Sequence, residues 1–287
     1  MRRAALPSPG GGGSEPRRGS GVGWSSTEVP LTPSRRAALA DLPPPGGGEE
    51  RKEGGGEDRA RGRAEIIVNS ISLIADPDGT LYWPEQGLLV AADLHLEKGS
   101  SFARRGVLLP PYDTAATLAR LAQSISRYRP QCVVALGDNF HDGEGAARMA
   151  DTDRAVLRGL QRGRDWVWIT GNHDPEPTEG IGGTFAAALA LGPLVFRHTP
   201  SRGQADGEIA GHLHPLACVV QRGRSVRRRC FAADGRRLVM PAFGAYTGGL
   251  NIRDRAFAGL FDRVALTVHM LGARRLYAIA AARCLGD

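Results

Sequence analysis

Three short, largely apolar runs of the chain each end abruptly in polar residues. They are Leu88–Ala92, Cys132–Leu136 and Trp166–Thr170. Apolar runs of this length, bounded by turn-forming residues, are typical of strands buried on both faces of a sheet. Between them, the spacing of Leu118, Leu121 and Ile125 predicts one helix, and Asp151–Gln161 predicts another. Strand, helix, strand, helix, strand is the pattern of a mostly parallel sheet with helices packed against it.

Local signals predict the elements before the first run and the limits of the first helix. Glu65–Ile74 alternates loosely and meets the turn tetrad Asp76–Gly79, so together with Leu81–Trp83 it predicts a hairpin. Asp113 is the predicted N-cap of the first helix, which should end before Pro130.

After residue 190 the pattern changes to short strand-like segments. These are Leu194–Phe196, Glu208–Gly211, Ala217–Gln221, Arg229–Ala233, Arg237–Met240, Val264–Leu271 and Leu276–Ala280. A short helix is predicted over Asp254–Phe261. The second half of the chain is therefore expected to be mostly β-structure.

The first 64 residues differ from the rest in composition. Among residues 1–65 there are 14 glycines and 8 prolines, which is above the level of about 25–30% that marks low-complexity sequence. We therefore expect residues 1–64 to be a disordered extension. Residues 65–287 should form one domain that is long enough for a sizeable core.

Charge and cysteine content narrow the class of protein further. The formal net charge of +7 is carried almost entirely by arginine, which fits either an anionic partner or the composition of a GC-rich genome. None of the four cysteines forms a C-x-x-C pair, so a structural zinc site is not indicated. We find no signal-peptide pattern and no run approaching the roughly 20 apolar residues of a membrane span. A cytoplasmic protein without membrane contact is expected.

Polar clusters with metal-binding chemistry follow five of the predicted strands. They are Asp93 and His95, Asp138, Asn172 and His173, His198, and His212 and His214. A single histidine at a strand end is usually an ordinary hydrogen-bonded residue, but five of the chain's seven histidines lie in these clusters. Carboxylates, imidazoles and an amide, without thiolates, suit Mn, Fe or Zn. The ligands exceed what one ion needs, so two ions about 3.5–4 Å apart could share them and activate a water to attack phosphorus.

The five clusters resemble the signature blocks of the calcineurin-like metallophosphoesterases. The matching segments are Asp93–His95, Gly137–Asp138, Gly171–Asp174, His198 and Gly211–His214. The resemblance implies an α/β fold in which a β-sandwich is flanked by helices and a dinuclear metal site lies at strand ends. It also implies that Asp93, His95 and His214 bind the first metal, Asp138 bridges, Asn172, His198 and His212 bind the second, His173 is the general acid, and Asp174 orients His173.

Further segments resemble one branch of that family, the ligase-associated DNA damage response endonucleases. They are Tyr82–Pro84, Asp93–Ala103, Leu108–Thr114, Gly211–Pro215 and Arg228–Phe231. The resemblance covers nearly all of residues 65–287. It implies two divalent metal ions, with manganese as the first choice and iron or zinc as alternatives. It also implies DNA as the substrate, and association with a DNA ligase, a helicase and an exonuclease of the same repair system.

Two features close to these blocks stay open. Many relatives have G-D-x-x-D at the second block, whereas here Gly137–Phe140 is followed by His141. His141 either contacts the substrate or only closes a loop, and the loop is the preferred interpretation. Five arginines are candidate contacts to DNA phosphates: Arg104, Arg105, Arg227, Arg228 and Arg229. The alternative for them is a solvated face of an arginine-rich protein.

The leading hypothesis is a metal-dependent phosphodiesterase or nuclease that acts on DNA. One alternative is a phosphatase or cyclic-nucleotide phosphodiesterase acting on small substrates. Another is a non-catalytic, metal-folded scaffold for repair partners, against which the intact His173 and the complete ligand set argue. No zinc-finger or RNP sequence is present, so sequence-specific recognition is not indicated.

Overall fold

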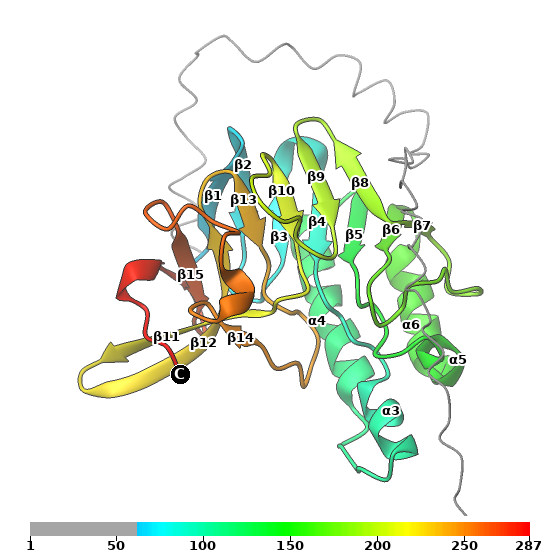
Figure 1. Cartoon of the computed structure of the whole chain (residues 1–287). Coiled ribbons are helices and arrows are strands. Elements are labelled where there is room, and N and C mark those ends of the chain that lie inside the picture. The colour runs from blue at the N-terminus through cyan, green and yellow to red at the C-terminus, as the bar shows by residue number, and fades with distance from the viewer. Residues whose placement is uncertain (1–61) are drawn as a thin grey trace, which may run out of the picture.

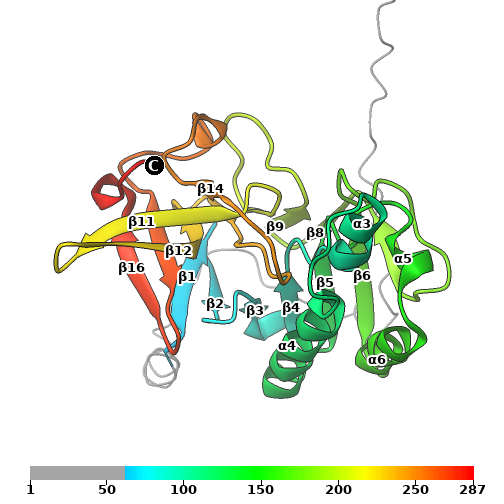
Figure 2. The same cartoon turned by 90° about the horizontal axis from the view of Figure 1, so that it is seen from below.

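Two β-sheets pack face to face in the computed structural model, and helices cover the outer face of one of them (Figure 1, Figure 2). The structure describes residues 62–287. The predicted extension, residues 1–64, lies outside the described residues except for its last three, and Ala64 already begins the first strand. The expected fold class, an α/β sandwich flanked by helices, is confirmed.

The first sheet contains seven strands that lie side by side in chain order. They are β1 (Ala64–Val68), β2 (Ile71–Ala75), β3 (Leu81–Trp83), β4 (Leu88–Ala91), β5 (Cys132–Leu136), β6 (Asp165–Ile169) and β7 (Thr184–Ala186). β1 to β4 pair antiparallel, whereas β4 to β7 pair parallel. The predicted hairpin is a three-stranded meander, because Asn69 and Ser70 both adopt positive φ and form an additional tight turn.

Helices cover the outer face of this sheet (Figure 2). The two long ones are α4 (Asp113–Tyr128) and α6 (Asp151–Gln161), and the two short ones are α3 (Lys98–Arg104) and α5 (Gly145–Arg148). α4 ends before Pro130, as predicted. Asp113 was expected to be its N-cap, but Tyr112 holds that position. The Asp113 carboxylate instead accepts a hydrogen bond from the Gly99 amide, since α3 lies against the start of α4.

The second sheet is built from the C-terminal half of the chain. It contains β8 (Ala188–Leu191), β9 (Leu194–Arg197), β10 (Glu208–Ala210), β11 (Pro215–Gln221), β12 (Arg224–Ala233), β13 (Arg237–Val239), β14 (Leu250–Asn251), β15 (Thr267–Leu271) and β16 (Leu276–Ala280). The predicted helix over Asp254–Phe261 is only a short 3₁₀ turn, Arg255–Phe257. Two other 3₁₀ turns are Pro84–Gln86 and Ala281–Arg283.

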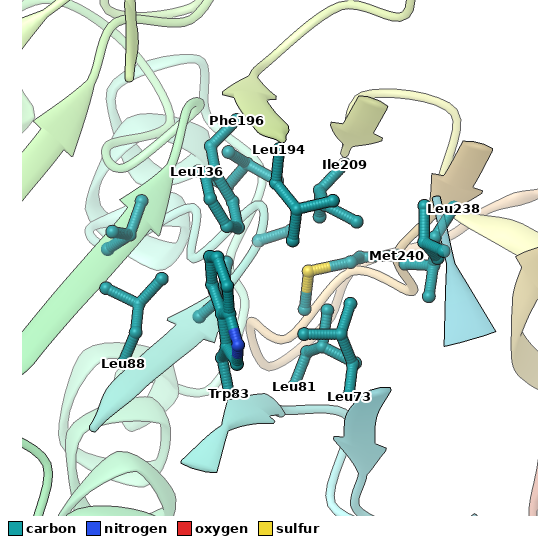
Figure 3. Packing of buried hydrophobic residues seen from close by; sticks show 14 of the residues in the cluster. Leu73, Leu81, Trp83, Leu88, Leu136, Leu194, Phe196, Ile209, Leu238 and Met240 are labelled. Atoms are coloured by element: carbon teal, nitrogen blue, oxygen red, sulfur yellow. The ribbon is translucent and has the colours of Figure 1, made fainter. Parts of the chain in front are cut away.

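Each sheet contributes to the core that separates them, which Figure 3 shows in close-up. Successive residues of β4 point to opposite faces of the first sheet. Leu88 and Val90 pack in the core between the two sheets, whereas Leu89 and Ala91 pack against the helices. All four are buried, and this explains why the run is apolar throughout instead of alternating.

A buried ion pair ties β10 to β13 within the second sheet. The guanidinium of Arg237, 1% exposed, lies against the carboxylate of Glu208. Arg237 also donates to the backbone carbonyls of Ser201, Gly203 and Leu260. Since these acceptors come from three separate loop positions, this one side chain organises the loops at that end of the sheet.

We expect Arg237→Met to lower the free energy of unfolding by about 3 kcal/mol, because it removes the buried guanidinium from Glu208. The carboxylate then keeps the more exposed Arg197, 3.5 Å away, as its cationic neighbour. Urea titration followed by circular dichroism measures the loss. Arg236→Gln is the matched control, since Arg236 pairs with Asp206 on the surface with both side chains 51% exposed. It should leave the urea midpoint close to that of the unmodified chain, because an exposed ion pair is screened by solvent. Equal losses in the two variants would contradict a special role for Arg237.

None of the helices within residues 62–287 is both long and apolar enough to cross a lipid bilayer.

Candidate metal centre

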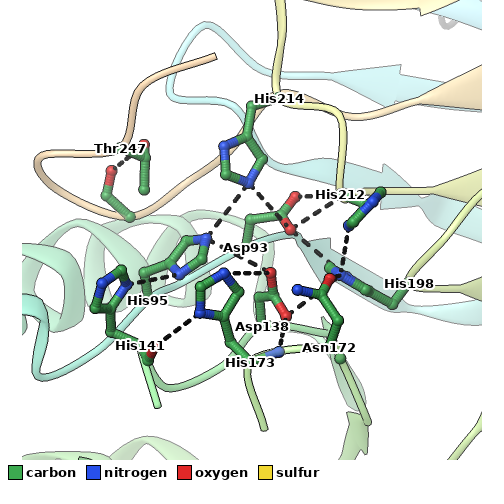
Figure 4. Close-up of polar contacts among 12 residues, drawn as sticks. Asp93, His95, Asp138, His141, Asn172, His173, His198, His212, His214 and Thr247 are labelled. Carbon is green, nitrogen blue, oxygen red and sulfur yellow. Dashed lines mark hydrogen bonds and ion pairs between the residues drawn. The ribbon is translucent and has the colours of Figure 1, made fainter. Parts of the chain in front are cut away.

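The polar clusters come together where strands of both sheets end, as Figure 4 shows. β4, β5 and β6 are parallel, so their carboxyl ends meet at one edge of the first sheet. β9 and β10 are parallel too, and they deliver their following residues from the second sheet. The first sheet thus contributes Asp93, His95, Asp138, Asn172 and His173, and the second contributes His198, His212 and His214.

One group of three potential ligands consists of Asp93, His95 and His214, whose ligand atoms lie within 4.8 Å of one another. His214 Nε2 lies 3.4 Å from His95 Nε2 and 3.3 Å from Asp93 Oδ1. Two imidazole nitrogens and a carboxylate oxygen therefore point at the same small volume.

A second group consists of Asp138, His198 and His212. His198 Nε2 lies 3.3 Å from Asp138 Oδ1, 3.1 Å from His212 Nδ1 and 2.9 Å from Asn172 Oδ1. The other oxygen of Asp138 lies 3.8 Å from His95 Nε2 in the first group. Asp138 is thus the carboxylate that faces both groups.

Backbone conformation at these positions is unusual, because five of the residues have left-handed φ angles. They are Asp93 (54°), His95 (43°), Asp138 (44°), His212 (69°) and His214 (46°). Asp93 and His95 do not project from a continuing strand, because β4 ends at Ala91 and the chain turns at both residues. Non-glycine residues in this region cost free energy and cluster at functional sites. The turns let Leu94, between them, remain buried while both polar side chains enter the site.

Two glycines allow the strand-end loops to approach closely. A Cβ atom at Gly171 would collide with the backbone of Asp138, and one at Gly137 would collide with the His198 ring. These glycines therefore belong to the site although they carry no ligand atom.

The electrostatics favour the metal-binding forms of three side chains, His95, His212 and Asp138. Burial acts to lower the pKa of His198, but its hydrogen bond to Asp138 and the charge of Asp93 raise it overall. Burial lowers the pKa of His95, with Asp138 opposing this effect and His214 reinforcing it. Burial also lowers the pKa of His212, and the charge of His198 adds to this. Burial raises the pKa of Asp138, but its hydrogen bond to His198 and the charge of His198 lower it overall. Neutral imidazoles and an ionised carboxylate are the forms that bind metal.

His173 lies beside Asp138 and is held by its neighbours. Its Nδ1 lies 2.8 Å from the carbonyl oxygen of His141, and because a carbonyl only accepts, Nδ1 carries the proton. Its Nε2 faces the centre, 3.9 Å from Asp138 Oδ2. Its backbone amide donates to Asp138 Oδ1. The His173 side chain is 39% exposed, so a substrate can reach its ring.

The role expected of Asp174, to orient His173, is not what the structure shows. The Asp174 carboxylate accepts from the backbone amides of Asn139, Phe140 and Gly171. Burial raises the pKa of Asp174 to about 6, and the Phe140 and Asn139 amides partly offset this. Asp174 therefore joins the loops after β5 and β6, whereas the His141 carbonyl orients His173.

His141, left open by the sequence, lies at the site. Its Nδ1 is 3.4 Å from Nδ1 of His95 and its ring stacks on His173, with centroids 5.2 Å apart. Burial first, and then the charge of Lys98, lower the pKa of His141 to about 4. The preferred interpretation, a residue that only closes a loop, is incomplete, because both its carbonyl and its ring contact site residues.

The five candidate arginines occupy different environments. Arg104 pairs with Glu144, and Arg105 lies over the Phe102 ring. Arg227 pairs with Asp287, and Arg228 is exposed on β12. Arg229 instead donates to the carbonyls of Ala242, Gly244 and Thr247. Since Phe243 and Gly244 in turn bond to Ala92 and Asp93, Arg229 supports a loop that borders the site.

The donor set fits divalent metal ions. In the two groups, the ligand atoms of neighbouring carboxylates and imidazoles lie 3.1–3.4 Å apart. Among the described residues, several of the imidazole nitrogens have only other ligand atoms as partners. Facing imidazoles cannot all donate, so lone pairs are directed at a shared volume where a cation would be stabilised.

Residues 88–224 match the family model for calcineurin-like phosphoesterases. The chain contains a calcineurin-like phosphoesterase domain. The match begins at β4 and ends where β12 starts, so it spans every candidate ligand. The family's enzymes are hydrolases that act on phosphoester bonds and use divalent metals.

Among solved structures, the Pseudomonas putida nuclease MPE is similar to this chain. The identity is 27%, the match covers 76% of this chain and 100% of the nuclease, and the TM-score is 0.59. Yfce, a phosphoesterase from E. coli, is 16% identical over 68% of this chain and 98% of its own, with a TM-score of 0.34. A search of curated proteins found no match. The calcineurin-like resemblance is confirmed, and the nuclease is consistent with the ligase-associated endonuclease branch.

Proposed function

We propose that this calcineurin-like phosphoesterase is a metal-dependent phosphodiesterase that cleaves DNA. The observation that carries the proposal is the convergence of two ligand groups, with Asp138 facing both and His173 beside it. The similarity to a nuclease over its whole length supports a nucleic-acid substrate.

In the proposed centre, Asp93, His95 and His214 hold one divalent ion, and Asn172, His198 and His212 hold the other. Asp138 would be shared by the two ligand groups, because its two oxygens face different groups. Bound ions would supply Lewis-acid stabilisation of a phosphate and activation of a water. Manganese is the first choice, with iron or zinc as alternatives, since the donors are oxygen and imidazole.

His173 is the proposed general acid. With Nδ1–H donated to the His141 carbonyl, Nε2 is the atom that delivers a proton to the leaving oxygen. The backbone amide of His173, anchored on Asp138, keeps the ring at the edge of the centre.

Asp174 acts on this machinery through the backbone. Its carboxylate accepts hydrogen bonds from backbone amides of the loops after β5 and β6, and this fixes Asp138 relative to His173. It is therefore a positioning residue.

The expected partners, a DNA ligase, a helicase and an exonuclease of one repair system, stay predictions, as does the cytoplasmic location. The arginines Arg104, Arg105, Arg227 and Arg228 remain proposed contacts to DNA. Arg228 has no carboxylate partner among the described residues, so its charge is available to a phosphate.

The proposal is tested by depleting the full chain of metal, reconstituting it with Mn²⁺, Fe²⁺ or Zn²⁺, and measuring hydrolysis. We expect cleavage of DNA and of bis-p-nitrophenyl phosphate, slow hydrolysis of the monoester, and loss of all activity with a chelator. Asp138→Asn, purified in parallel, reports contaminating nuclease. Rapid monoester hydrolysis without DNA cleavage would favour the small-substrate phosphatase. Metal binding without any hydrolysis would favour the scaffold.

A further inference from the structure

Two cationic side chains of the first helix after β4 gather at one aromatic ring. Lys98 Nζ lies 5.8 Å from the centre of the Phe102 ring, and the Arg105 guanidinium carbon lies 5.9 Å from it. Lys98 also donates to the carbonyl of Tyr246, at 3.0 Å. This bond uses one of three ammonium hydrogens and fixes the position of the group.

These two charges lack the carboxylate partners that their neighbours have. Arg104 pairs with Glu144, and Arg148 pairs with Asp142. Within residues 62–287, no carboxylate lies at ion-pair distance from either Lys98 or Arg105, although the Asp113 carboxylate is near enough to act on Lys98 electrostatically. The pair is therefore a local excess of positive charge beside the candidate metal centre, where an anion would be stabilised.

A stack of rings connects this pair to the proposed general acid. The Phe102 ring lies 5.5 Å from that of His141, and His141 lies 5.2 Å from His173. The interplanar angle is 34° between Phe102 and His141, which are tilted, and 25° between His141 and His173, which stack. The charge pair is thus two rings away from His173.

We propose that Lys98 and Arg105 bind the phosphate next to the scissile one, on the leaving-group side of a nucleic-acid strand. The inference rests on the proposed function, because His173 marks the side from which the leaving oxygen departs. The nucleotide attached to that oxygen extends past His141 and Phe102. The first further negative charge along it is its next phosphate, which meets the unpaired cations. The protein then distinguishes substrates by their leaving groups. A leaving group that carries a phosphate is bound by Lys98 and Arg105, whereas a substrate whose leaving group lacks a phosphate is bound only at the metal centre.

Two substrates with the same thymidine on one side of the scissile phosphate separate the two cases. Oligothymidylate has a leaving nucleotide with a phosphate, whereas thymidine 5′-(p-nitrophenyl phosphate) has p-nitrophenol. For Lys98→Gln with Arg105→Gln we expect kcat/KM on oligothymidylate to fall about tenfold. The nitrophenyl ester should change less than about twofold. The dependence of log KM on log salt for the oligonucleotide should become shallower by about 0.7, the loss of one phosphate contact to a single strand.

Two control variants accompany the test. Arg158→Gln with Arg162→Gln removes the same charge from exposed positions of α6 and the turn after it, and should leave both substrates unchanged. Arg105→Gln alone changes an exposed side chain, so it keeps the inference testable if the Lys98 change impairs folding. It should give part of the oligonucleotide defect.

Three results would overturn the inference. Unchanged oligothymidylate cleavage would show that the two cations make no contact with the strand. Equal losses on both substrates would show that the two ends of α3 only support the metal centre. Failure of the unmodified chain to cleave oligothymidylate, with the nitrophenyl ester hydrolysed, would remove the proposed function itself, and is distinguishable because it appears without any substitution.

Discussion

The His173→Ala chain is expected to lose DNA cleavage by about 10²–10⁴-fold and to retain most hydrolysis of bis-p-nitrophenyl phosphate. A deoxynucleoside leaving group needs a proton as the P–O bond breaks, whereas p-nitrophenolate departs as a stable anion. His173 Nε2 is the proposed proton donor at the edge of the centre. The ring belongs to neither of the ligand groups around Asp93 and Asp138, but lies in a third cluster with His95 and His141.

Initial rates on both substrates, measured on protein of known metal content, check this expectation. A series of diesters with progressively more basic leaving groups sharpens it, because the defect should grow with basicity. A uniform defect across the series would assign His173 to substrate binding instead of proton transfer.

The second large effect is expected for Asp138→Asn, which should lower activity on DNA and on small diesters alike by about 10³-fold. Asp138 faces both ligand groups, and an amide supplies neither the charge nor two equivalent oxygens. Metal analysis after gel filtration should show less bound metal per chain than in the unmodified protein.

Asp142→Asn is the matched control for this variant. Asp142 lies on the same loop, four residues further on, but its carboxylate pairs with Arg148 and lies outside both ligand groups. It should keep its metal content and most of its activity. Full metal occupancy and activity in Asp138→Asn would exclude the bridging role.

The sequence could predict the site because strand ends in a parallel sheet must meet. The runs that became β4, β5 and β6 are buried on both faces, which makes them recognisable without knowledge of their neighbours. The helix over Asp151–Gln161 has the predicted limits. Once the strands are known, the convergence of Asp93, Asp138 and Asn172 follows from topology.

Other features depend on contacts that local sequence does not encode. β7 and β8, from the alanine-rich segment 184–191, are strands because β6 and β9 pair with them. The left-handed turns at Asp93 and His95 are set by the loops that surround them. The orienting partner of His173 is a backbone carbonyl, which every residue possesses, so no side-chain pattern could have distinguished His141 from Asp174.

The ligands' origin in two separate sheets has a consequence for how the molecule matures. His214 is 119 residues from His95, and their Nε2 atoms come within 3.4 Å of each other only across the assembled sandwich. Contacts of such long range form late in folding. A chain in which the two sheets have not yet packed together has the candidate ligands of each sheet apart from those of the other. Such a chain could not form the proposed hydrolytic centre. Bound metal would in turn act as a cross-link between the two sheets, so that the proposed nuclease activity would exist only in the folded protein.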